Sequence, residues 1–510
     1  MSLFNYLKKC IHTIMKPPSK IKTVLFLAAV LCTFNNIISQ VPEAGFESIY
    51  SKSLMQTVNT LCSDEFGGRL PGSEGYDKAA EFVAERFEQI GLLPAGDERY
   101  FQYLNVEYNK IDSPVVFKVI TSQKSVSYEP GKDFVFRGFT GSGNINLPVA
   151  FCGYGISRHD LGYDDYENIN VENKVVIVFK QNPSWKINEN SWGQEYPREK
   201  SIIAYEHGAK GILFVSRPND SKPQPLIGSV MHGEGKQLLN FPQLQISIEV
   251  ANNILSGSGF SLAGSQTKID ESKTQNSFIT ENEAEIKVQT DYEKYAKTMN
   301  IVGLLEGSDP VLKEEYLIIG AHLDHVGSQG GLLFPGANDN ASGSAAVIEV
   351  AKAFQKSEAK PKRSILFVLF ASEEQGLFGS KYFVDNLKID SEKIIAMFNL
   401  DCVGYGDSIQ IGNGKSAPEL WKIANKLDKK DLNLMVENTW SGGGADLTPF
   451  YEKGIPGLYF ASRYSYEHLH RPTDTPETLN PKLLESIVKL AYLTAREVAY
   501  GNFKREVINK

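Results

Sequence analysis

The chain has 510 residues, of which 42% are hydrophobic and 22% are charged, and its formal net charge at pH 7 is −8. This length is sufficient for two or three domains with sizeable cores. The acidic balance argues against a protein that binds nucleic acid, because such proteins present a basic surface.

The N-terminal residues have the order of a secretory signal. Lysines precede the apolar run 23–34 (TVLFLAAVLCTF), and small and polar residues follow it. The run is short for a membrane span. We therefore expect a signal peptide over residues 1–39 and a secreted, periplasmic or cell-envelope protein, with an uncleaved signal as the alternative membrane anchor. Met15 is an alternative translation start, because residues 1–14 are long for the leading region of a signal peptide and the residues after Met15 match its order without them.

Three cysteines remain after this segment, namely Cys62, Cys152 and Cys402. An odd and sparse set does not form a disulfide framework. It allows one bridge and requires none.

Residues 44–103 are expected to be mainly helical. Ser73 or Glu74 opens a helix that Gly91 ends. Apolar residues recur between them at helical spacing: Ala79, Val83, Phe87 and Ile90.

Residues 106–288 have a different sequence pattern, with short β-rich runs between loops of Gly, Pro, Asn and Asp. Residues 199–215 (EKSIIAYEHGAKGILFV) predict a helix that passes through a glycine turn into a strand. The polar stretch 264–283 is expected to be a surface loop. We interpret 106–288 as a separate domain inserted in the chain.

From residue 289 onward, strand and helix patterns alternate. Strands are expected at 316–320, 364–370, 394–400 and 457–460, and helices at 342–355, 379–387, 417–427 and 481–497. This alternation predicts an α/β fold with a mixed, largely parallel sheet and helices on both faces.

Five residues suited to metal binding lie at or just after the ends of apolar runs or open a helix: His322, Asp339, Glu374, Asp401 and His470. Such sheets bind ligands outside the carboxyl ends of their strands. Two imidazoles and three carboxylates are suitable ligands for two divalent ions.

Two ions about 3.5–4 Å apart need a carboxylate that bridges them. Asp339 is the candidate, since it lies in a tight Gly-Ala-Asn-Asp-Asn turn before a helix. Its simpler interpretation is a helix N-cap. Four of the eight histidines fall in two clusters, which favours metal binding: His322, His325, His468 and His470.

Two further carboxylates have candidate roles. Glu373 stands beside Glu374 and is free to act as a general base. Asp324 follows His322 by two residues and is placed to accept the other ring N–H of that histidine. The simpler interpretations are a solvated loop for the glutamate pair and a turn residue for Asp324.

The motifs FGGRLPGSEG, NIVGLLEGSDP, GAHLDHVG, GANDNASG, ASEEQGLFGS, NLDCVG and HRPTDT occur in this order from about Phe66 to the C-terminus. As a set, they resemble those of the exported bacterial di-zinc aminopeptidases of the leucyl type. These enzymes have a zinc exopeptidase fold with an inserted protease-associated domain. The resemblance places that domain at 106–288 and the two parts of the peptidase domain at 40–105 and 289–510.

The resemblance also implies two Zn²⁺ ions per chain. His322 and Asp401 would bind one ion and Glu374 and His470 the other, with Asp339 bridging them and a cis peptide bond after it. Zinc also precedes manganese and cobalt in affinity at such sites.

The implied reaction is the removal of N-terminal amino acids from peptides that have a free N-terminus. Glu373 would be the general base and Asp324 would orient His322. Two departures concern substrate preference and rate. The chain has Asp446 and Leu447 where relatives often have an Asp-His pair, and Leu469 where they often have a tyrosine; Tyr464 or Tyr466 are possible substitutes.

Three alternatives remain. A two-zinc carboxypeptidase on the same scaffold would need basic residues for a C-terminal carboxylate, and Arg463 and Arg471 are near the site in sequence. An aminoacyl cyclase of related fold would use a single zinc ion. A receptor-like protein without catalysis would have lost its ligands, whereas all five and the base are present here.

Overall fold

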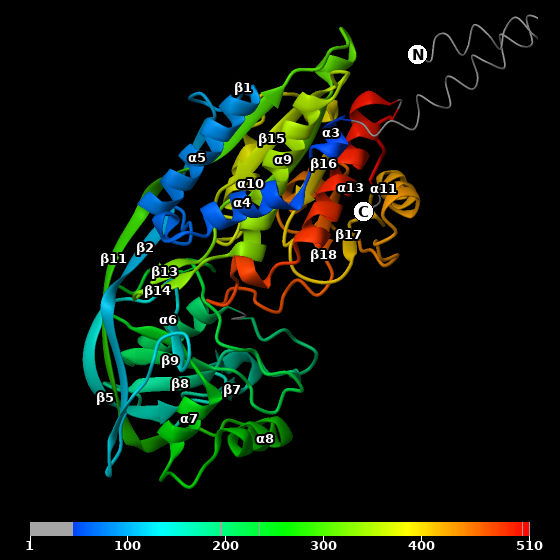
Figure 1. Ribbon diagram of the computed structural model, residues 1–510. Coiled ribbons are helices and arrows are strands. Elements are labelled where there is room, and N and C mark those ends of the chain that lie inside the picture. Colours follow the sequence, from blue (N-terminus) through cyan, green and yellow to red (C-terminus); the bar gives the residue numbers. More distant parts are fainter. Residues whose placement is uncertain (1–43, 194–195, 234, 502, 509–510) are drawn as a thin grey trace, which may run out of the picture.

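A computed structural model describes residues 44–193, 196–233, 235–501 and 503–508 (Figure 1). The expected signal peptide at residues 1–39 lies outside the described residues. Within the described part, no helix combines the length and the apolar character that crossing a bilayer requires. Cys62, Cys152 and Cys402 are free thiols.

A mixed and largely parallel sheet organises the upper unit in Figure 1. Strands β12, β15, β16 and β18 are parallel, β17 pairs antiparallel at one edge, and β11 pairs antiparallel with β15. Their bounds are β11 Phe278–Leu305, β12 Tyr316–His322, β15 Ser364–Phe370, β16 Ile394–Leu400, β17 Ile409–Gly412 and β18 Gly457–Ser462. The predicted fold class is confirmed.

Helices cover both faces of this sheet. One face carries α3 Ala44–Glu47, α4 Ser51–Leu61, α5 Glu74–Ile90, α9 Ser342–Lys356 and α13 Pro481–Tyr500, with α11 Pro418–Asp431 packed on α13. The other carries α10 Phe378–Asp385 and α12 Leu447–Glu452. Successive residues of β12 point to opposite faces, so Leu317 and Ile319 join one core and Ile318 the other.

The residues that the sequence pattern placed at the ends of α5 perform these roles. Ser73 is the N-cap, and its side chain accepts a hydrogen bond from Tyr76 N at 3.2 Å. Gly91 ends the helix with φ +88°, a left-handed conformation that glycine adopts without steric cost.

Residues of the inserted segment form a second unit with its own cores. Strands β5, β8, β9 and β10 are parallel, and β4 pairs antiparallel with β10. The bounds are β4 Phe134–Phe136, β5 Gly143–Phe151, β8 Val175–Phe179, β9 Gly211–Val215, β10 Gln243–Ile246, α6 Pro197–Glu206, α7 Ile248–Leu255 and α8 Leu262–Ser272. The helix, turn and strand predicted at 199–215 are α6 and β9.

The prediction of a surface loop at 264–283 is wrong. Residues to Ser272 belong to α8, which Ser261 caps at Gly264 N, and β11 begins at Phe278. The stretch is polar because α8 buries only one narrow side, which includes Leu262 and Ile269.

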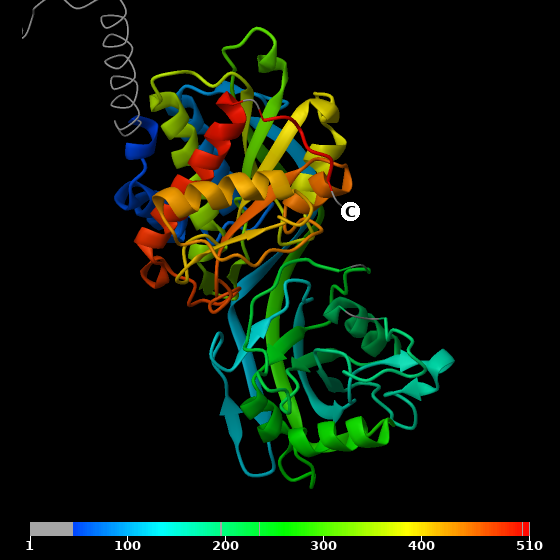
Figure 2. The ribbon, with the colours of Figure 1, turned by 90° about the vertical axis from the view of Figure 1, so that its right-hand side faces the viewer.

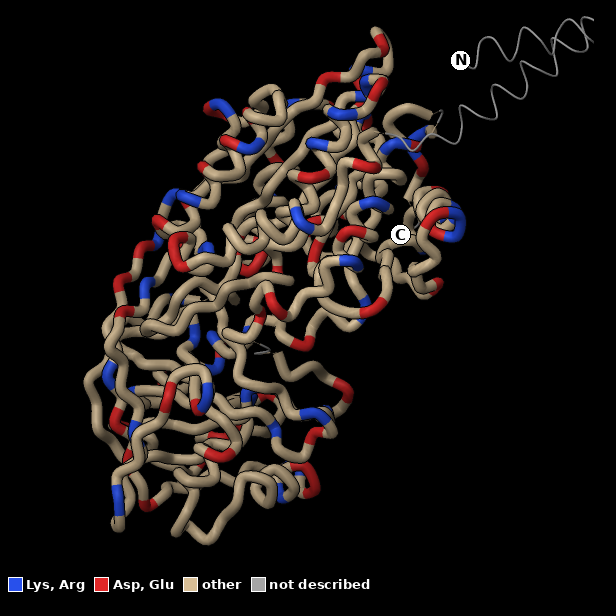
Figure 3. The backbone as a smooth tube through the Cα atoms, viewed as in Figure 1, with Lys and Arg blue, Asp and Glu red and all other residues tan. Residues whose placement is uncertain are grey.

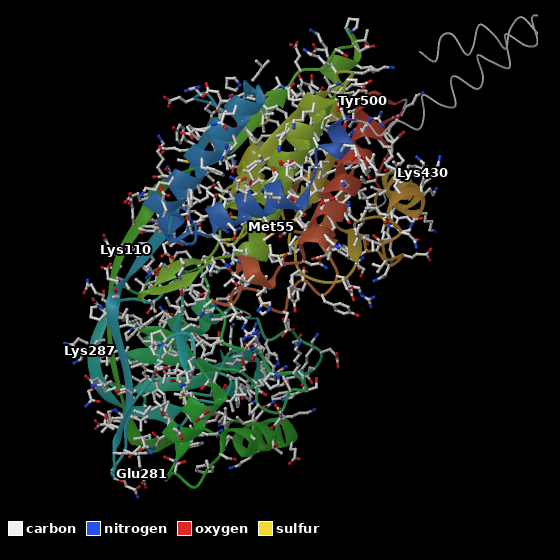
Figure 4. The ribbon with its side chains drawn as sticks, in the orientation of Figure 1. Met55, Lys110, Glu281, Lys287, Lys430 and Tyr500 are labelled. Atoms are coloured by element: carbon white, nitrogen blue, oxygen red, sulfur yellow. The ribbon has the colours of Figure 1, made fainter. Side chains whose placement is uncertain are left out.

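Two long strands join the units. β2 (Phe101–Ile120) pairs antiparallel with β11 along most of its length, and both strands run through both units (Figures 1 and 2). The side chains of Lys110 on β2 and Lys287 on β11 point outward from this ribbon (Figure 4). The units therefore share one continuous sheet and are not connected by a linker.

Smaller elements complete the fold. The short strands are β1 Leu93–Pro94, β3 Ser125–Ser127, β6 Ser157–Arg158, β7 Tyr163–Asp164, β13 Gly327–Gln329 and β14 Leu332–Phe334. The 3₁₀ turns are η1 Asp64–Phe66, η2 His159–Leu161, η3 Leu312–Glu314, η5 Ser391–Lys393 and η6 Pro476–Thr478, and Ala337–Ala341 forms an irregular turn in which Asp339 and Asn340 have non-helical backbone angles. Lys and Arg are interspersed with Asp and Glu over both units (Figure 3).

Candidate metal centre

The carboxyl ends of β12, β15 and β16 lie side by side, because these strands are neighbours and parallel. The end of an open α/β sheet is where such folds bind their ligands. The side chains that the strands deliver there are His322, Glu373, Glu374 and Asp401. Asp339 comes from the turn before α9, and His470 comes from the loop after β18.

The first group of donors surrounds the ring of His322. Its Nε2 lies 3.3 Å from Asp339 Oδ1 and 3.4 Å from Asp401 Oδ1. All three side chains are buried. The hydroxyl of Tyr459 donates to Asp401 Oδ2 at 3.1 Å, so the other oxygen of this carboxylate faces His322.

The second group of donors surrounds the ring of His470. Its Nε2 lies 2.8 Å from Glu374 Oε2 and 3.2 Å from Asp339 Oδ2. Asp339 therefore presents Oδ1 to one group and Oδ2 to the other, which is the position of a bridging carboxylate.

The turn that carries Asp339 is held from several sides. The carboxylate of Asp474 accepts hydrogen bonds from Asn338 N at 2.9 Å and from Asp339 N at 3.1 Å. The Asp339–Asn340 peptide bond is cis. The sequence pattern did not reveal this role of Asp474, which fixes both backbone N–H groups beside the bridging carboxylate.

A buried arginine supports the same region. The guanidinium of Arg69 is fully buried and donates to four backbone carbonyls, those of Leu61, Leu323, Pro335 and Gly336. It connects the end of α4 with the segments on either side of the metal-binding turn. Arg69 lies in the FGGRLPGSEG motif, and its role was not predicted from the sequence.

Asp324 lies between His322 and the glutamate pair. His322 Nδ1 is 3.1 Å from the backbone carbonyl oxygen of Asp324 and 3.7 Å from its carboxylate. The carboxylate accepts hydrogen bonds from Glu373 N at 3.1 Å and Glu374 N at 3.3 Å. Asp324 therefore contacts His322 mainly through its backbone and uses its side chain to position the glutamates.

The electrostatics of the centre are dominated by buried carboxylates. Burial raises the pKa of Asp339, but hydrogen bonds from His322 and His470 outweigh burial and hold this pKa well below its usual range. Burial lowers the pKa of His322, but the carboxylates of Asp401 and Glu373 outweigh burial and raise it well above its usual range. Excess buried negative charge of this kind requires compensation by cations.

Burial raises the pKa of Glu373 well above its usual range, while the charge of His322 opposes this and Glu374 and Asp446 add to it. Burial likewise raises the pKa of Asp446 to about 7. Glu373 forms no ion pair with any described residue, which leaves its carboxyl group free for proton transfer.

The donor set fits zinc. It contains imidazole nitrogens and carboxylate oxygens only, which zinc accepts at about 2.0–2.2 Å. Donors around one tetrahedral ion are then roughly 3.3–3.6 Å apart, close to the distances of 2.8–3.4 Å within the two groups. Two clusters, in each of which the donor atoms lie within 4.8 Å of one another, share Asp339: His322 with Asp401, and His325 with Glu374.

The tyrosines and arginines that the sequence offered as possible substrate-binding residues lie on the surface near the His470 loop. Tyr464 is exposed and stacks under the guanidinium of Arg463. Tyr466 is exposed to a similar degree, although local burial of its hydroxyl and the neighbouring Cys402 and Asp401 raise its pKa to about 12. Arg471 is on the surface, where its guanidinium donates to the carbonyl oxygen of Glu467 at 3.2 Å.

The inserted unit contacts the loop that carries His470. Gly228 N donates to the carbonyl oxygen of His470 at 2.7 Å. Beside this contact, Val135 and Leu226 of the insert pack with Val326 and Phe334 of the sheet unit. The insert therefore supports one side of the donor set.

Comparison with protein families matches residues 300–495 to the model of peptidase family M28. The chain is 27% identical to the aminopeptidase YwaD of Bacillus subtilis (strain 168) over 492 residues, which cover 90% of this chain and 87% of the relative. It is 38% identical to an aminopeptidase of Pseudomonas aeruginosa (strain UCBPP-PA14) over 365 residues, which cover 71% of this chain and 59% of the relative. A probable glutamate carboxypeptidase of Arabidopsis thaliana is 24% identical over 89% of this chain and 73% of its own length.

Two solved structures share the fold over 91% of this chain, each with 19% sequence identity. An aminopeptidase from Aneurinibacillus sp. strain AM-1 superposes with a TM-score of 0.63 over 97% of its length. A zinc aminopeptidase from Bacillus subtilis superposes with a TM-score of 0.60 over 98% of its length.

Proposed function

We propose that this metallo-aminopeptidase, whose residues 300–495 match peptidase family M28, removes single N-terminal residues from peptides at a centre of two zinc ions. The observation that carries this proposal is the position of Asp339. Its two carboxylate oxygens face two separate donor groups, at 3.3 Å from His322 and 3.2 Å from His470.

In this proposal His322 and Asp401 would hold one zinc ion and Glu374 and His470 the other, with Asp339 as the carboxylate that both would share. Bound zinc lowers the pKa of water to about 7 and polarises the carbonyl group that is attacked. Asp324 and Asp474 hold the backbone of the glutamate pair and of the Asp339 turn, so the donors are fixed before substrate arrives.

Glu373 is the proposed general base. Its carboxyl group takes a proton from the attacking water and returns it to the amine that leaves. Burial moves its pKa upward, and a general base works best with a pKa near the operating pH.

An excess of carboxylates suits a substrate that brings a positive charge. The free α-ammonium of a peptide N-terminus is such a group, whereas a C-terminal carboxylate would need a cation. Arg463 and Arg471, the cations near the site in sequence, contact Tyr464 and the Glu467 backbone. The carboxypeptidase alternative is retained because one relative is named a probable glutamate carboxypeptidase.

We further propose that residues 106–288 are a protease-associated domain that shapes access to the centre, and that residues 1–39 direct export to the cell envelope or beyond. The insert's contact with the His470 loop supports the first part. N-terminal sequencing of the protein purified from producing cells and their medium tests the second. A mature chain that begins near residue 40 is expected, and an intact N-terminus would contradict export by a cleaved signal.

The activity is tested with one peptide offered with a free and with an acetylated N-terminus, with products analysed by mass spectrometry. Loss of single N-terminal residues from the free form alone is expected. Trimming of both forms from the C-terminus would instead establish a carboxypeptidase.

A further inference from the structure

Glu107 lies at an irregularity in the long ribbon of β2 and β11. The register of the two strands shifts between Glu293 and Ala296, so Glu107 has no directly opposite partner in the ladder. Bulges of this kind interrupt pairing, re-aim side chains and are frequent beside active sites. The carbonyl group and the side chain of Glu107 are therefore available for contacts outside the ladder.

The carbonyl group of Glu107 contacts the segment that carries the glutamate pair. Gln375, which directly follows Glu373 and Glu374, donates from Nε2 to the carbonyl oxygen of Glu107 at 2.7 Å. Gln375 is buried, and the chain turns immediately after it, because Gly376 N donates to the carbonyl oxygen of Glu373 at 2.9 Å. A displacement of Glu107 would therefore be felt at the backbone of Glu373.

The carboxylate of Glu107 contacts the inserted unit. Arg198, in the first turn of α6, donates from Nη1 and Nη2 to its two oxygens at 2.7 and 3.0 Å. The hydroxyl of Tyr292 on β11 donates to the same carboxylate at 2.5 Å. Burial raises the pKa of Glu107, but these hydrogen bonds outweigh burial and hold this pKa below its usual range. The pair is therefore ionic, and its bidentate geometry fixes orientation as well as charge.

Arg198 also holds the loop of the insert that approaches the centre. Its Nη1 donates to the carbonyl oxygen of Gly233 at 3.1 Å. Gly228, earlier in the same loop, donates to the carbonyl oxygen of His470. With only 4% of its side chain exposed, Arg198 thus joins α6, this loop and Glu107 in the interior of the protein.

The glutamate pair is consequently held from two sides. On one side, the carboxylate of Asp324 accepts hydrogen bonds from Glu373 N and Glu374 N. On the other side, the amide of Gln375 is anchored on Glu107, which a residue of the insert fixes. A general base must stay within hydrogen-bond reach of the proton that it takes, so a small displacement of this segment is costly for turnover.

We propose that Glu107 and Arg198 are positioning residues for catalysis: the ion pair fixes Glu107, Glu107 fixes Gln375, and through it the ion pair keeps the carboxyl group of Glu373 in place. The inserted unit thereby contributes to turnover itself. The inference rests on the proposed function, in which Glu373 is the general base. The competing role of the ion pair is to stabilise the junction of the two units without any effect on the glutamate pair.

The first test removes the ion pair without leaving an unpaired charge, by combining Glu107→Gln with Arg198→Gln. We expect kcat on a peptide with a free N-terminus to fall by about 10-fold, while KM and zinc content stay within about twofold of wild type. Arg198→Lys keeps the charge but not the bidentate contact and should have an intermediate kcat. A wild-type kcat in the double variant, or a loss confined to KM, would overturn the proposal.

Glu285→Gln is the matched control. Glu285 lies on β11, where its carboxylate pairs with Lys118 and Lys287 at 3.2 and 2.8 Å beside the core of the insert. Its replacement should leave kcat unchanged, and thermal unfolding of all variants shows how much stability each has lost. If Glu285→Gln lowers kcat as much as the double variant does, the ion pair of Glu107 has no special role and the proposal fails.

A second test asks whether the effect passes through Gln375. Gln375→Met removes the amide donor and keeps a side chain of similar length. If the ion pair acts through this amide, the double substitution should lower kcat much less in a Gln375→Met chain than in the wild type. The same fold-loss in both backgrounds would contradict the proposal.

Hydrogen exchange measured by mass spectrometry gives a readout that needs no activity. The N–H groups of Glu373, Glu374 and Gly376 are hydrogen-bonded, so their exchange reports how firmly the segment is held. These groups should exchange faster in the full-length double variant than in the wild type, and at the wild-type rate in Glu285→Gln. Unchanged exchange in the double variant would overturn the proposal.

Failure of the proposed function has a different signature. It would appear as a wild-type chain that does not release N-terminal residues. The inference alone fails if the wild type is an active aminopeptidase and the double variant has the same kcat and the same exchange.

Discussion

At the scale of single residues, the donor positions were accessible from the sequence because each follows a strand or opens a helix. The structure brings His322, Asp339, Glu374, Asp401 and His470 together as this logic expects. His325 and Asp474 were not assigned roles, because the direction of a side chain beyond a strand end depends on loop backbone that local patterns do not specify. Two histidines in HLDH were the signal available for His325.

The clearest residue-scale prediction concerns Glu373. Glu373→Gln removes the proton acceptor but keeps a side chain of the same shape. We expect zinc content to stay at the wild-type level while turnover falls by about 10²–10⁴-fold. Zinc content by elemental mass spectrometry and kcat on a peptide substrate measure the two effects. A near-normal kcat would refute the role of Glu373 as the general base.

Asp474 acts through the turn that carries Asp339. Asp474→Ala removes the acceptor of two backbone hydrogen bonds, and such supporting residues typically contribute about 10- to 100-fold in metal affinity or activity. Chelator competition should reveal this loss. Thr473→Ala is the control, because the exposed Thr473 contacts the half-buried His468. Equal zinc affinity in the two variants would contradict the assigned role.

At the scale of elements, the boundaries of helices and strands were predictable where capping and stop residues agreed with the spacing of apolar residues. The α5 helix runs from Glu74 to Ile90 between its expected cap and glycine, and β15 and β16 have the expected bounds. The prediction of a surface loop at 264–283 was wrong because α8 buries only a narrow apolar stripe, which the polar composition of the segment does not reveal. The secondary structure of that segment depends on its tertiary contacts.

The cap of α5 provides a stability test. Ser73→Ala removes the side-chain acceptor for Tyr76 N, and the loss of an N-cap typically costs about 1 kcal/mol. The midpoint of thermal unfolding should fall by a few degrees. The exposed Ser125→Ala, outside any helix, should leave the midpoint unchanged, and an equal midpoint for both variants would contradict the capping role.

Lys200 of α6 makes the stability of the inserted unit depend on pH. It is fully buried, and burial lowers its pKa to about 7, with Asp165 opposing this shift. Between pH 7 and 10.5 the unfolded chain keeps a proton on Lys200 that the folded chain has lost. The contribution of Lys200 to the free energy of unfolding therefore increases with pH in that window. Below pH 7 the full free-energy cost of burying the charged ammonium group is present.

Lys200→Met removes the titrating group. The variant should gain thermal stability relative to the wild type at the lower end of this window, and the gain should shrink toward the upper end. Thermal unfolding of both proteins at the two ends measures the difference. A difference that is independent of pH would contradict the assignment.

At the scale of the whole molecule, the sequence indicated two units but not how they are joined. A change in sequence pattern reveals that a segment is distinct. The pairing of β2 with β11 across both units depends instead on residues far apart in the chain. This pairing makes the inserted unit an extension of one sheet. It also explains how Gly228 can hold the loop of His470 at a fixed position.

Gly228 tests the coupling between the units. A Cβ atom there would lie 2.6 Å from Val326 Cγ1 and 2.7 Å from the ring of Phe334, so Gly228→Val should push the insert away from the His470 loop. We expect lower kcat/KM and weaker zinc retention, together with faster proteolysis of the insert. Lys222→Val, on an exposed residue of the same segment, is the control. Unchanged kcat/KM and zinc retention in the glycine variant would show that the insert does not support the centre.

The most direct measurement of the central claim is an anomalous difference map at the zinc absorption edge from crystals of the zinc-loaded protein. The account predicts two peaks, one beside His322 and Asp401 and one beside Glu374 and His470, with Asp339 between them. A single peak, or two peaks of which only one touches Asp339, would contradict it.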